Sequence, residues 1–160
     1  GTFMVANTCS LVSTVQDMTT TGKDGYDFLK LDTGMTELLR PSLYGSNHPI
    51  VVVPKGREED SIGEYVVVGH CCESGDLISC EPDDASALQA RKMARTVRGD
   101  VCVIEGVGAY CSSMSAKNYN SFPEAAELLV DEAGELHLIR ERQEIQDMWK
   151  YERPLPSGVL

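Results

Sequence analysis

The chain has 160 residues, enough for one domain with a hydrophobic core or for one part of a larger protein, but too few for two full domains. It carries 25 acidic against 14 basic residues, a net charge of -11, which disfavours a surface that follows nucleic-acid phosphates. No apolar run is long enough to span a bilayer and no secretory leader is recognisable, so we expect no association with membranes. The six cysteines lie in or beside apolar runs, so we expect reduced thiols in a cytoplasmic protein.

The first half of the chain reads as short strands joined by polar turns. A hairpin is expected across Gly22 and Gly25, because residues that alternate between polar and apolar flank this turn on both sides. The apolar run that directly follows Gly1 indicates a strand, and we interpret it as the start of a domain cut from something longer. The strands predicted in this half are residues 3–6, 10–15, 26–31, 50–53 and 64–68.

The second half continues the strand pattern with two helical exceptions. Residues 83–97 have alanines among charges and predict a weakly amphipathic helix or a loop excursion. Seven or eight strands without a regular alternation of strands and helices indicate a mainly β fold, a β-sandwich or Greek-key barrel with short helices, over residues 1–153. The other elements predicted here are strands at 101–104, 127–130 and 135–139, a short helix at 143–151 and a frayed tail at 154–160.

The densest chemistry lies in residues 70–76, His-Cys-Cys-Glu-Ser-Gly-Asp, directly after a predicted strand. A thiol beside a carboxylate can donate a proton next to a group that holds an ammonium, which suits amino-acid chemistry. A zinc site is disfavoured because adjacent cysteines cannot easily ligate one metal and no Cys-x-x-Cys pair occurs. An inert, buried thiol at the end of a strand remains an alternative.

Arg40 and Tyr44 are a second candidate pair because they lie four residues apart. On one helical turn the guanidinium and the phenol would share a face and could grip one carboxylate. Pro41 complicates this geometry, and we expect the helical turns at 36–39 to end before it. The alternative is an arginine that caps carbonyl groups beside a half-buried tyrosine.

Two other motifs have simple structural explanations. Residues 98–100, Arg-Gly-Asp, invite an adhesion reading, but a Gly-Asp turn that leads into a strand accounts for them fully. Residues 106–110 place two glycines ahead of Tyr110. The glycines would let the backbone approach a ligand such as a phosphate, or would serve tight packing between strands.

Three separated segments resemble, in the same order, the pyridoxal-phosphate-dependent diaminopimelate decarboxylases. Residues 31–45 contain Asp-Thr-Gly-Met, then Arg-Pro and Leu-Tyr-Gly. Residues 72–76, Cys-Glu-Ser-Gly-Asp, resemble the most diagnostic signature of the family. Residues 108–121 contain Gly-Ala-Tyr, Ser-Met-Ser and Tyr-Asn-Ser and resemble the third. Together these segments cover most of the chain.

The resemblance implies a domain organisation. The family pairs an N-terminal TIM barrel, which carries the lysine that binds pyridoxal 5'-phosphate, with a C-terminal β domain, and this chain resembles only the latter. None of the six lysines lies in a segment similar to the cofactor-binding one. We therefore expect the chain alone to be inactive. The family also implies a homodimer in which the loop with the cysteine enters the barrel of the partner.

The resemblance also implies roles for individual residues in the decarboxylation of meso-diaminopimelate to L-lysine. Cys72 would donate the proton to the substrate and Glu73 would hold the distal ammonium. Arg40 and Tyr44 would bind the distal carboxylate. Tyr110 would reach both the cofactor phosphate and the substrate.

Two departures from the family concern substrate choice. The chain has Thr2 where the family usually has an arginine that also binds the carboxylate, and residues 83–97 look longer than the usual link. A decarboxylase of another amino acid, such as ornithine or a carboxylated polyamine, is one alternative, although those relatives usually lack Glu-Ser-Gly after the cysteine. A non-catalytic dimerisation or regulatory β domain is the other.

Overall fold

The structure is a computed structural model that describes residues 1–159 and divides the chain into two compact units, Gly1–Ala116 and Lys117–Leu160. The first unit consists mainly of strands with short helices. Its strands are β1 (Ser10–Thr20), β2 (Asp27–Leu31), β3 (Ile50–Val53), β4 (Ile62–Val68), β5 (Cys80–Glu81), β6 (Asp84–Leu88), β7 (Arg91–Ala94) and β8 (Val101–Glu105). Its helices are α1 (Thr2–Val5), the 3-10 turn η1 (Ala6–Thr8), α2 (Arg40–Tyr44) and α3 (Cys111–Met114).

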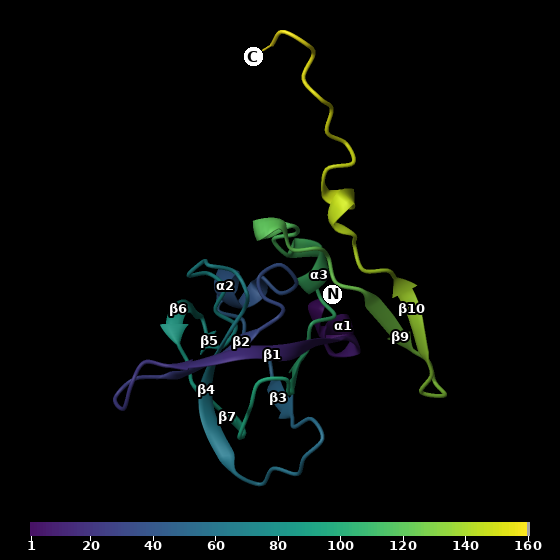
Figure 1. The fold of residues 1–160 in the computed structure, drawn as a ribbon. Helices are drawn as coiled ribbons and strands as arrows, with labels where there is room; N and C mark the ends of the chain where they lie inside the picture. Colours follow the sequence, from purple (N-terminus) through teal and green to yellow (C-terminus); the bar gives the residue numbers. More distant parts are fainter. Residues whose placement is uncertain (160) are drawn as a thin grey trace. The chain divides into compact units, whose positions relative to one another are not determined.

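Six of these strands form one sheet in the order β3-β8-β1-β2-β4-β7 (Figure 1). The neighbours pair antiparallel except β2 and β4, which are parallel. The two edge strands, β3 and β7, also contact each other, so the sheet curls into a nearly closed barrel. This confirms the predicted mainly β fold with short helices, in its barrel form, and the predicted hairpin between β1 and β2.

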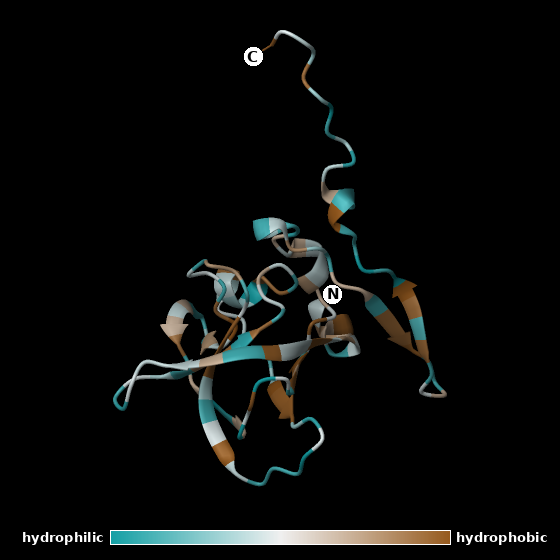
Figure 2. Cartoon of the chain, in the orientation of Figure 1, coloured by the Kyte–Doolittle hydropathy of each residue, from teal (hydrophilic) through white to brown (hydrophobic). Residues whose placement is uncertain are grey.

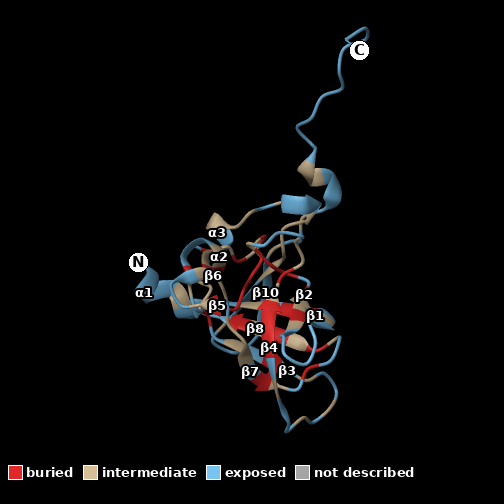
Figure 3. Ribbon diagram, turned by 90° about the vertical axis from the view of Figure 1, so that its left-hand side faces the viewer, coloured by how far each residue is buried: buried red, intermediate tan, exposed pale blue. Residues whose placement is uncertain are grey.

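The core lies on the concave face of this sheet. Buried residues alternate with less buried ones along β8 and in the middle of β1, as the period of two in a strand requires. In β4, by contrast, three consecutive residues, 65–67, are buried (Figure 3), and Val66 belongs to a second apolar cluster with Leu77 and Cys80. Fully buried members are Val15, Leu29, Leu31, Val67, Cys102 and Ile104. The outward side chains of β3, Val51 and Val53, are about half exposed. The apolar composition of residues 50–53 therefore predicted a strand but did not predict which of its faces is buried.

The prediction for residues 83–97 is wrong. They form β6 and β7 with a short connection, and β6 pairs with β5 in a two-stranded ribbon. Ala85 and Ala87 are half-buried on one face of β6, whereas its other residues are exposed. Alanine has the highest helix propensity, but propensity is a weak determinant of structure, and the period-two burial available in this ribbon overrides it.

Two short predicted elements at the N-terminal side are also wrong. Residues 3–6 belong to α1 and η1 and not to a strand, and Phe3 is 95% exposed. The predicted helix at 36–39 is only a turn, and the helix begins at Arg40 with Pro41 in its first turn. Proline suits that position because its missing N–H would have no partner there and its φ is already helical. Pro41 therefore starts this helix and does not end one.

The second unit contains the predicted hairpin, β9 (Glu127–Val130) with β10 (Leu136–Arg140), and two 3-10 turns, η2 (Tyr119–Ser121) and η3 (Ile145–Met148). The helix predicted over 143–151 is reduced to η3. Residues 154–159 have no regular secondary structure, and residue 160 of the predicted tail lies outside the described residues. Figure 2 shows the apolar character of the hairpin, whose exposed members are Leu128, Leu129, Val130, Leu136, Leu138 and Ile139.

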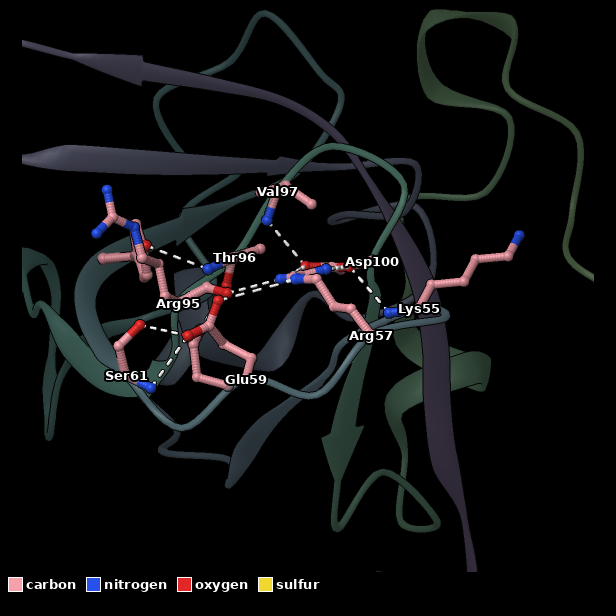
Figure 4. Close-up of polar contacts among 10 residues, drawn as sticks. Lys55, Arg57, Glu59, Ser61, Arg95, Thr96, Val97 and Asp100 are labelled. Carbon is pink, nitrogen blue, oxygen red and sulfur yellow. Dashed lines mark hydrogen bonds and ion pairs between the residues drawn. The ribbon is translucent and has the colours of Figure 1, made fainter.

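An ion pair between Arg57 and the buried Asp100 joins the loop after β3 to the start of β8 (Figure 4). Asp100, only 1% exposed, accepts hydrogen bonds from both terminal nitrogens of Arg57 and from the backbone N–H groups of Lys55 and Val97. The bonds to Arg57 and then to the backbone lower the pKa of Asp100 to about 2. Because the Asp100 carboxylate is buried and occupied by these hydrogen bonds, it is not accessible to a receptor. The structure therefore argues against an adhesion motif at residues 98–100, as we expected.

Three further observations concern the whole described chain. None of the helices in residues 1–159 is long and apolar enough to cross a membrane. Within the same residues, no group of three or more histidine, cysteine or acidic side chains is placed to hold a metal. Within these described residues, no disulfide joins any two of the six cysteines.

Candidate active site

The loop of residues 70–76 leaves the end of β4 and returns beside it. Its ends are joined because the Gly69 N–H donates to the Asp76 carbonyl at 2.9 Å and Val68 pairs with Leu77 in an antiparallel bridge. A second bond, from the Asp76 N–H to the Glu73 carbonyl at 3.0 Å, closes the turn within the loop. The loop is therefore a compact projection and not an open excursion, and we call it the thiol loop.

The carboxylate of Asp76 holds the inner side of the thiol loop. It is 4% exposed and accepts two backbone hydrogen bonds, from Met35 and from Cys71, both at 2.6 Å. A Cβ on Gly34 or on Gly69 would collide with its oxygens, so both positions require glycine for this approach. Burial raises the pKa of Asp76 even though these hydrogen bonds act in the opposite direction.

The two adjacent thiols have different environments. Cys71 is partly buried, and burial followed by the nearby charge of Asp76 raises the pKa of its thiol to about 12. Cys72 is exposed. Residues 70–75 form bends and a turn and not the extended segment that we expected, so the difference between the two thiols comes from how the loop folds over Asp76. The exposed one is Cys72, the residue that sequence reasoning proposed as the proton donor.

Glu73 also lies on the outer side of the thiol loop. Its carboxylate accepts hydrogen bonds from the Gly75 N–H at 3.2 Å and from the Ser74 hydroxyl at 3.1 Å. The backbone bond from Gly75, with that of Ser74, lowers the pKa of Glu73, so the group is ionised at neutral pH. An exposed, ionised carboxylate next to Cys72 is suited to hold an ammonium group.

Thr36 and Glu37, from the turn before α2, contact His70 at the start of the thiol loop. The Thr36 hydroxyl lies 2.7 Å from His70 Nε2 and donates to Glu37 at 2.6 Å. Glu37 also accepts the Gly34 N–H at 3.0 Å and lies 4.0 Å from His70 Nε2. Both side chains of the His70 and Glu37 pair are nearly buried. Sequence reasoning missed Thr36 and Glu37, since nothing in their local pattern indicates contact with a loop 34 residues away.

Helix α2 brings the predicted anion-binding side chains together. The guanidinium carbon of Arg40 lies 5.1 Å from the ring centre of Tyr44 and 5.9 Å from that of Tyr110, within the range of cation–π contacts. Both tyrosines are about half exposed. The pairing of Arg40 with Tyr44 follows from their spacing on the helix, whereas the arrival of Tyr110 does not. We call these three residues the Arg–Tyr cluster.

Tyr110 is held by an unusual backbone and by close packing. Its φ of 62° is left-handed, which is uncommon for a residue with a side chain and here turns the chain into α3. Gly108 ahead of it donates to the Ala6 carbonyl at 3.0 Å, and a Cβ there would collide with the Val5 carbonyl. The glycine thus serves close packing, here against α1 and η1 and not between strands. A Cβ on Gly1 would lie 3.3 Å from the Tyr110 hydroxyl, so the chain start borders the cluster.

His48 links the segments that carry the Arg–Tyr cluster. It is buried, and its Nδ1 donates to the Glu105 carbonyl at 3.1 Å, which ties the segment after α2 to the end of β8. Burial lowers the pKa of His48, and the nearby charge of Arg40 acts in the same direction. The ring is therefore neutral at pH 7 and adds no second cation beside Arg40.

The thiol loop and the Arg–Tyr cluster are neighbours in space. A Cβ on Gly75 would lie 3.8 Å from Ser42 Cβ in α2, which is ordinary van der Waals contact. The hydrogen bond from Met35 to Asp76 joins the same loop to the turn that precedes Arg40. The structure thus brings the loop that carries a thiol and a carboxylate close to the helix that carries a guanidinium and a phenol. Such a set can donate a proton and bind a molecule with ammonium and carboxylate groups.

Comparisons with known proteins identify the family of this chain. Residues 2–108 match the family model described as pyridoxal-dependent decarboxylase, C-terminal sheet domain. A diaminopimelate decarboxylase of Buchnera aphidicola is 37% identical over 155 residues, which are 95% of this chain and 36% of that protein. The chain thus spans about a third of the length of the curated relatives that it matches.

Solved structures give the same result. A crystal structure of a diaminopimelate decarboxylase superposes with a TM-score of 0.84 at 36% identity, over 93% of this chain and 35% of that one. The Helicobacter pylori enzyme complexed with L-lysine superposes with a TM-score of 0.75 at 33% identity, over 93% of this chain and 33% of that one. The chain belongs to the pyridoxal-dependent decarboxylase family and corresponds to the C-terminal sheet domain of its members.

Proposed function

We propose that the protein to which this chain belongs is a cytoplasmic, homodimeric diaminopimelate decarboxylase that converts meso-diaminopimelate to L-lysine with pyridoxal 5'-phosphate. The observation that carries this proposal is the close approach of the thiol loop, which carries Cys72 and Glu73, to α2, which carries Arg40 and Tyr44. Relatives at 37% identity carry this name, and one solved relative was complexed with L-lysine.

Each group has a distinct task in this reaction. The cofactor, when bound, serves as an electron sink while the α-carboxylate leaves. Cys72 then supplies a proton to the α-carbon, and the exposed carboxylate of Glu73 holds the distal ammonium of the substrate. Arg40 and Tyr44 bind the distal carboxylate. A substrate held at both ends presents one carbon to the thiol.

The residues present fit one part of the cofactor. The phenol of Tyr110 is half exposed and lies beside the cation of Arg40, an arrangement suited to an anionic phosphate or carboxylate. No lysine lies on the thiol loop or on α2, so these segments offer no amine for a covalent link. We therefore assign to this chain a contact to the cofactor through Tyr110 and not its attachment.

The site is proposed to form between two subunits. Cys72 and Glu73 are exposed on a projecting loop, as expected for groups that act on a ligand held by another domain. In the homodimer the thiol loop of one subunit enters the barrel of its partner. Sequencing the gene on both sides of this region tests the proposal. An upstream TIM barrel with a cofactor lysine supports it, and a lysine-free upstream region would instead support a non-catalytic dimerisation or regulatory domain.

The isolated chain should fold without binding pyridoxal 5'-phosphate covalently, because the groups found here suit contacts to the cofactor and provide no amine at the site. Spectrophotometric titration with the cofactor, followed by borohydride reduction and mass spectrometry, measures this. A stoichiometric adduct on one lysine of this chain would contradict the expectation that the covalent link to the cofactor is made by another domain. Chain that has been unfolded in urea serves as the control for random lysine modification.

Arg40 and Glu73 should set substrate specificity in the intact protein. Arg40→Ala leaves the distal carboxylate of the substrate without its cation, at a cost of roughly 2 to 5 kcal/mol in transition-state binding if that contact is buried. Turnover of diaminopimelate should therefore fall far more than the residual turnover of analogues that lack the distal carboxylate. Glu73→Gln should affect both substrate classes, since both retain the ammonium.

Arg98→Ala and Glu64→Gln are matched controls, because both residues are exposed and lie outside the thiol loop and the Arg–Tyr cluster. Steady-state kcat/KM on the two substrate classes is the measurement. Equal losses on both classes for Arg40→Ala would argue against its assignment to the distal carboxylate.

A further inference from the structure

The thiol loop is joined to the turn before α2 by one side chain. Asp76 accepts the N–H of Cys71, within its own loop, and the N–H of Met35, five residues before Arg40, at 2.6 Å each. We propose that Asp76 is a positioning residue whose carboxylate fixes the thiol of Cys72 relative to the guanidinium of Arg40. This role rests on the proposed function of those two residues, and no role in the reaction is otherwise assigned to Asp76.

The surroundings of Asp76 are built around its carboxylate. Gly34 and Gly69 approach the two oxygens from both sides, and a Cβ at either position would displace them. Neither glycine has a positive φ, so the backbone alone does not require glycine there. Space for the carboxylate is therefore the reason for both glycines. Two separate segments thus accommodate one side chain.

Asp76 differs from the other buried carboxylate in what stabilises its charge. Asp100 has the guanidinium of Arg57 as a partner, and its pKa falls to about 2. Asp76 faces the imidazole of His70 and the thiol of Cys71 but no arginine or lysine, and burial raises its pKa. A raised pKa means that ionisation is less favourable in the folded chain than in the unfolded one, so this charge reduces stability at neutral pH. The role of the Asp76 carboxylate is therefore to position the loop and not to stabilise the fold.

The two hydrogen bonds that Asp76 accepts from Met35 and Cys71, which we call the Asp76 clamp, can be tested directly by amide hydrogen exchange in this chain. Asp76→Asn keeps the size of the side chain but offers one acceptor oxygen in place of two, so one of the two N–H groups loses its partner. We expect hydrogen exchange to accelerate by about tenfold or more at the amide, of Met35 or of Cys71, that loses its partner, while the amides of β1 and β8 stay protected. Unchanged exchange at both amides would overturn the proposal.

A second variant tests whether moving the Asp76 carboxylate, without removing its charge, has the same effect on amide exchange. Gly69→Ala keeps Asp76 but pushes its carboxylate away, so it should accelerate exchange at the same two amides. Gly75→Ala is the matched control in the same loop, because its Cβ makes only ordinary contacts and its φ is not positive. A wild-type exchange pattern in Gly69→Ala would also count against the clamp.

In the intact protein, replacing Asp76 should affect the reaction rate and replacing Asp100 should affect stability. Asp76→Asn should lower kcat by about tenfold with a melting temperature close to that of the wild type, whereas Asp100→Asn should lower the melting temperature and leave kcat unchanged. An Asp76→Asn protein that fails to fold, or that loses stability as Asp100→Asn does, would show a structural role only. Cys72→Ala distinguishes the two proposals: full activity in that variant rejects the proposed function, while the exchange result still decides the clamp.

Discussion

Replacing Cys72 by alanine in the intact protein is expected to slow the protonation step by about 10²-fold or more, the range for a positioned general acid. Replacing Cys71 by alanine should leave this step nearly unchanged. The reason is geometric, since Cys72 is exposed whereas Cys71 is partly buried beside Asp76. Burial, and then the nearby charge of Asp76, raise the pKa of the Cys71 thiol to about 12, which makes it a poor proton donor at neutral pH.

Single-turnover kinetics with both variants measures this difference, and Cys9→Ala, at an exposed cysteine outside the thiol loop, serves as a control. Alkylation of the chain followed by peptide mass spectrometry should label Cys72 well before Cys71. Equal slowing in the Cys71 and Cys72 variants would contradict the assignment. Product of altered stereochemistry from Cys72→Ala would support it, because protonation from solvent is not confined to one face.

The same variant tests whether the active site is shared. Cys72→Ala subunits, mixed with subunits that lack the cofactor lysine, should recover activity, because one site of each heterodimer then combines an intact lysine with an intact thiol. The homodimers of both variants provide the baseline. Absence of recovered activity, with heterodimers shown to form by mass spectrometry, would contradict a site built from two subunits.

Removing the cation from the buried ion pair should cause the largest loss of stability. Arg57→Ala leaves the Asp100 carboxylate buried without its charged partner, and we expect the melting temperature to fall on the order of 10 °C. The two backbone N–H bonds to Asp100 remain and limit the loss. Lys30→Ala removes an exposed ion pair with Asp17 and should change the melting temperature little.

The pH dependence of stability follows from the same pair. The pKa of Asp100 is about 2 in the folded chain, below its ordinary value of about 3.9 in an unfolded one. A lowered pKa stabilises the fold above the unfolded value, and this contribution is lost as the pH falls from about 4 towards 2. Arg57→Ala should therefore show a weaker loss of stability across this acid range than the wild type. Parallel acid denaturation curves for the two proteins would contradict the assignment.

Local pattern determined a large part of the fold. The hairpin between β1 and β2, strand β3, strand β8 and the hairpin in the second unit were predictable because alternation and turn glycines act over a few residues. Residues 83–97 and the turn before Pro41 were not. There the preferences of alanine and proline allow more than one structure, and pairing with distant strands selects the one observed.

The sequence by itself also determined the family and its candidate residues, because motif identity and order are local properties of the chain. Only the tertiary structure decided how these residues meet: Tyr110 reaches Arg40 through a left-handed turn. It also decided that Cys72 and not Cys71 is exposed, and that Asp76 bonds to Met35 across 41 residues. Contacts at such separations depend on how the sheet curls and which backbone donors are left without partners, and no local spacing records either.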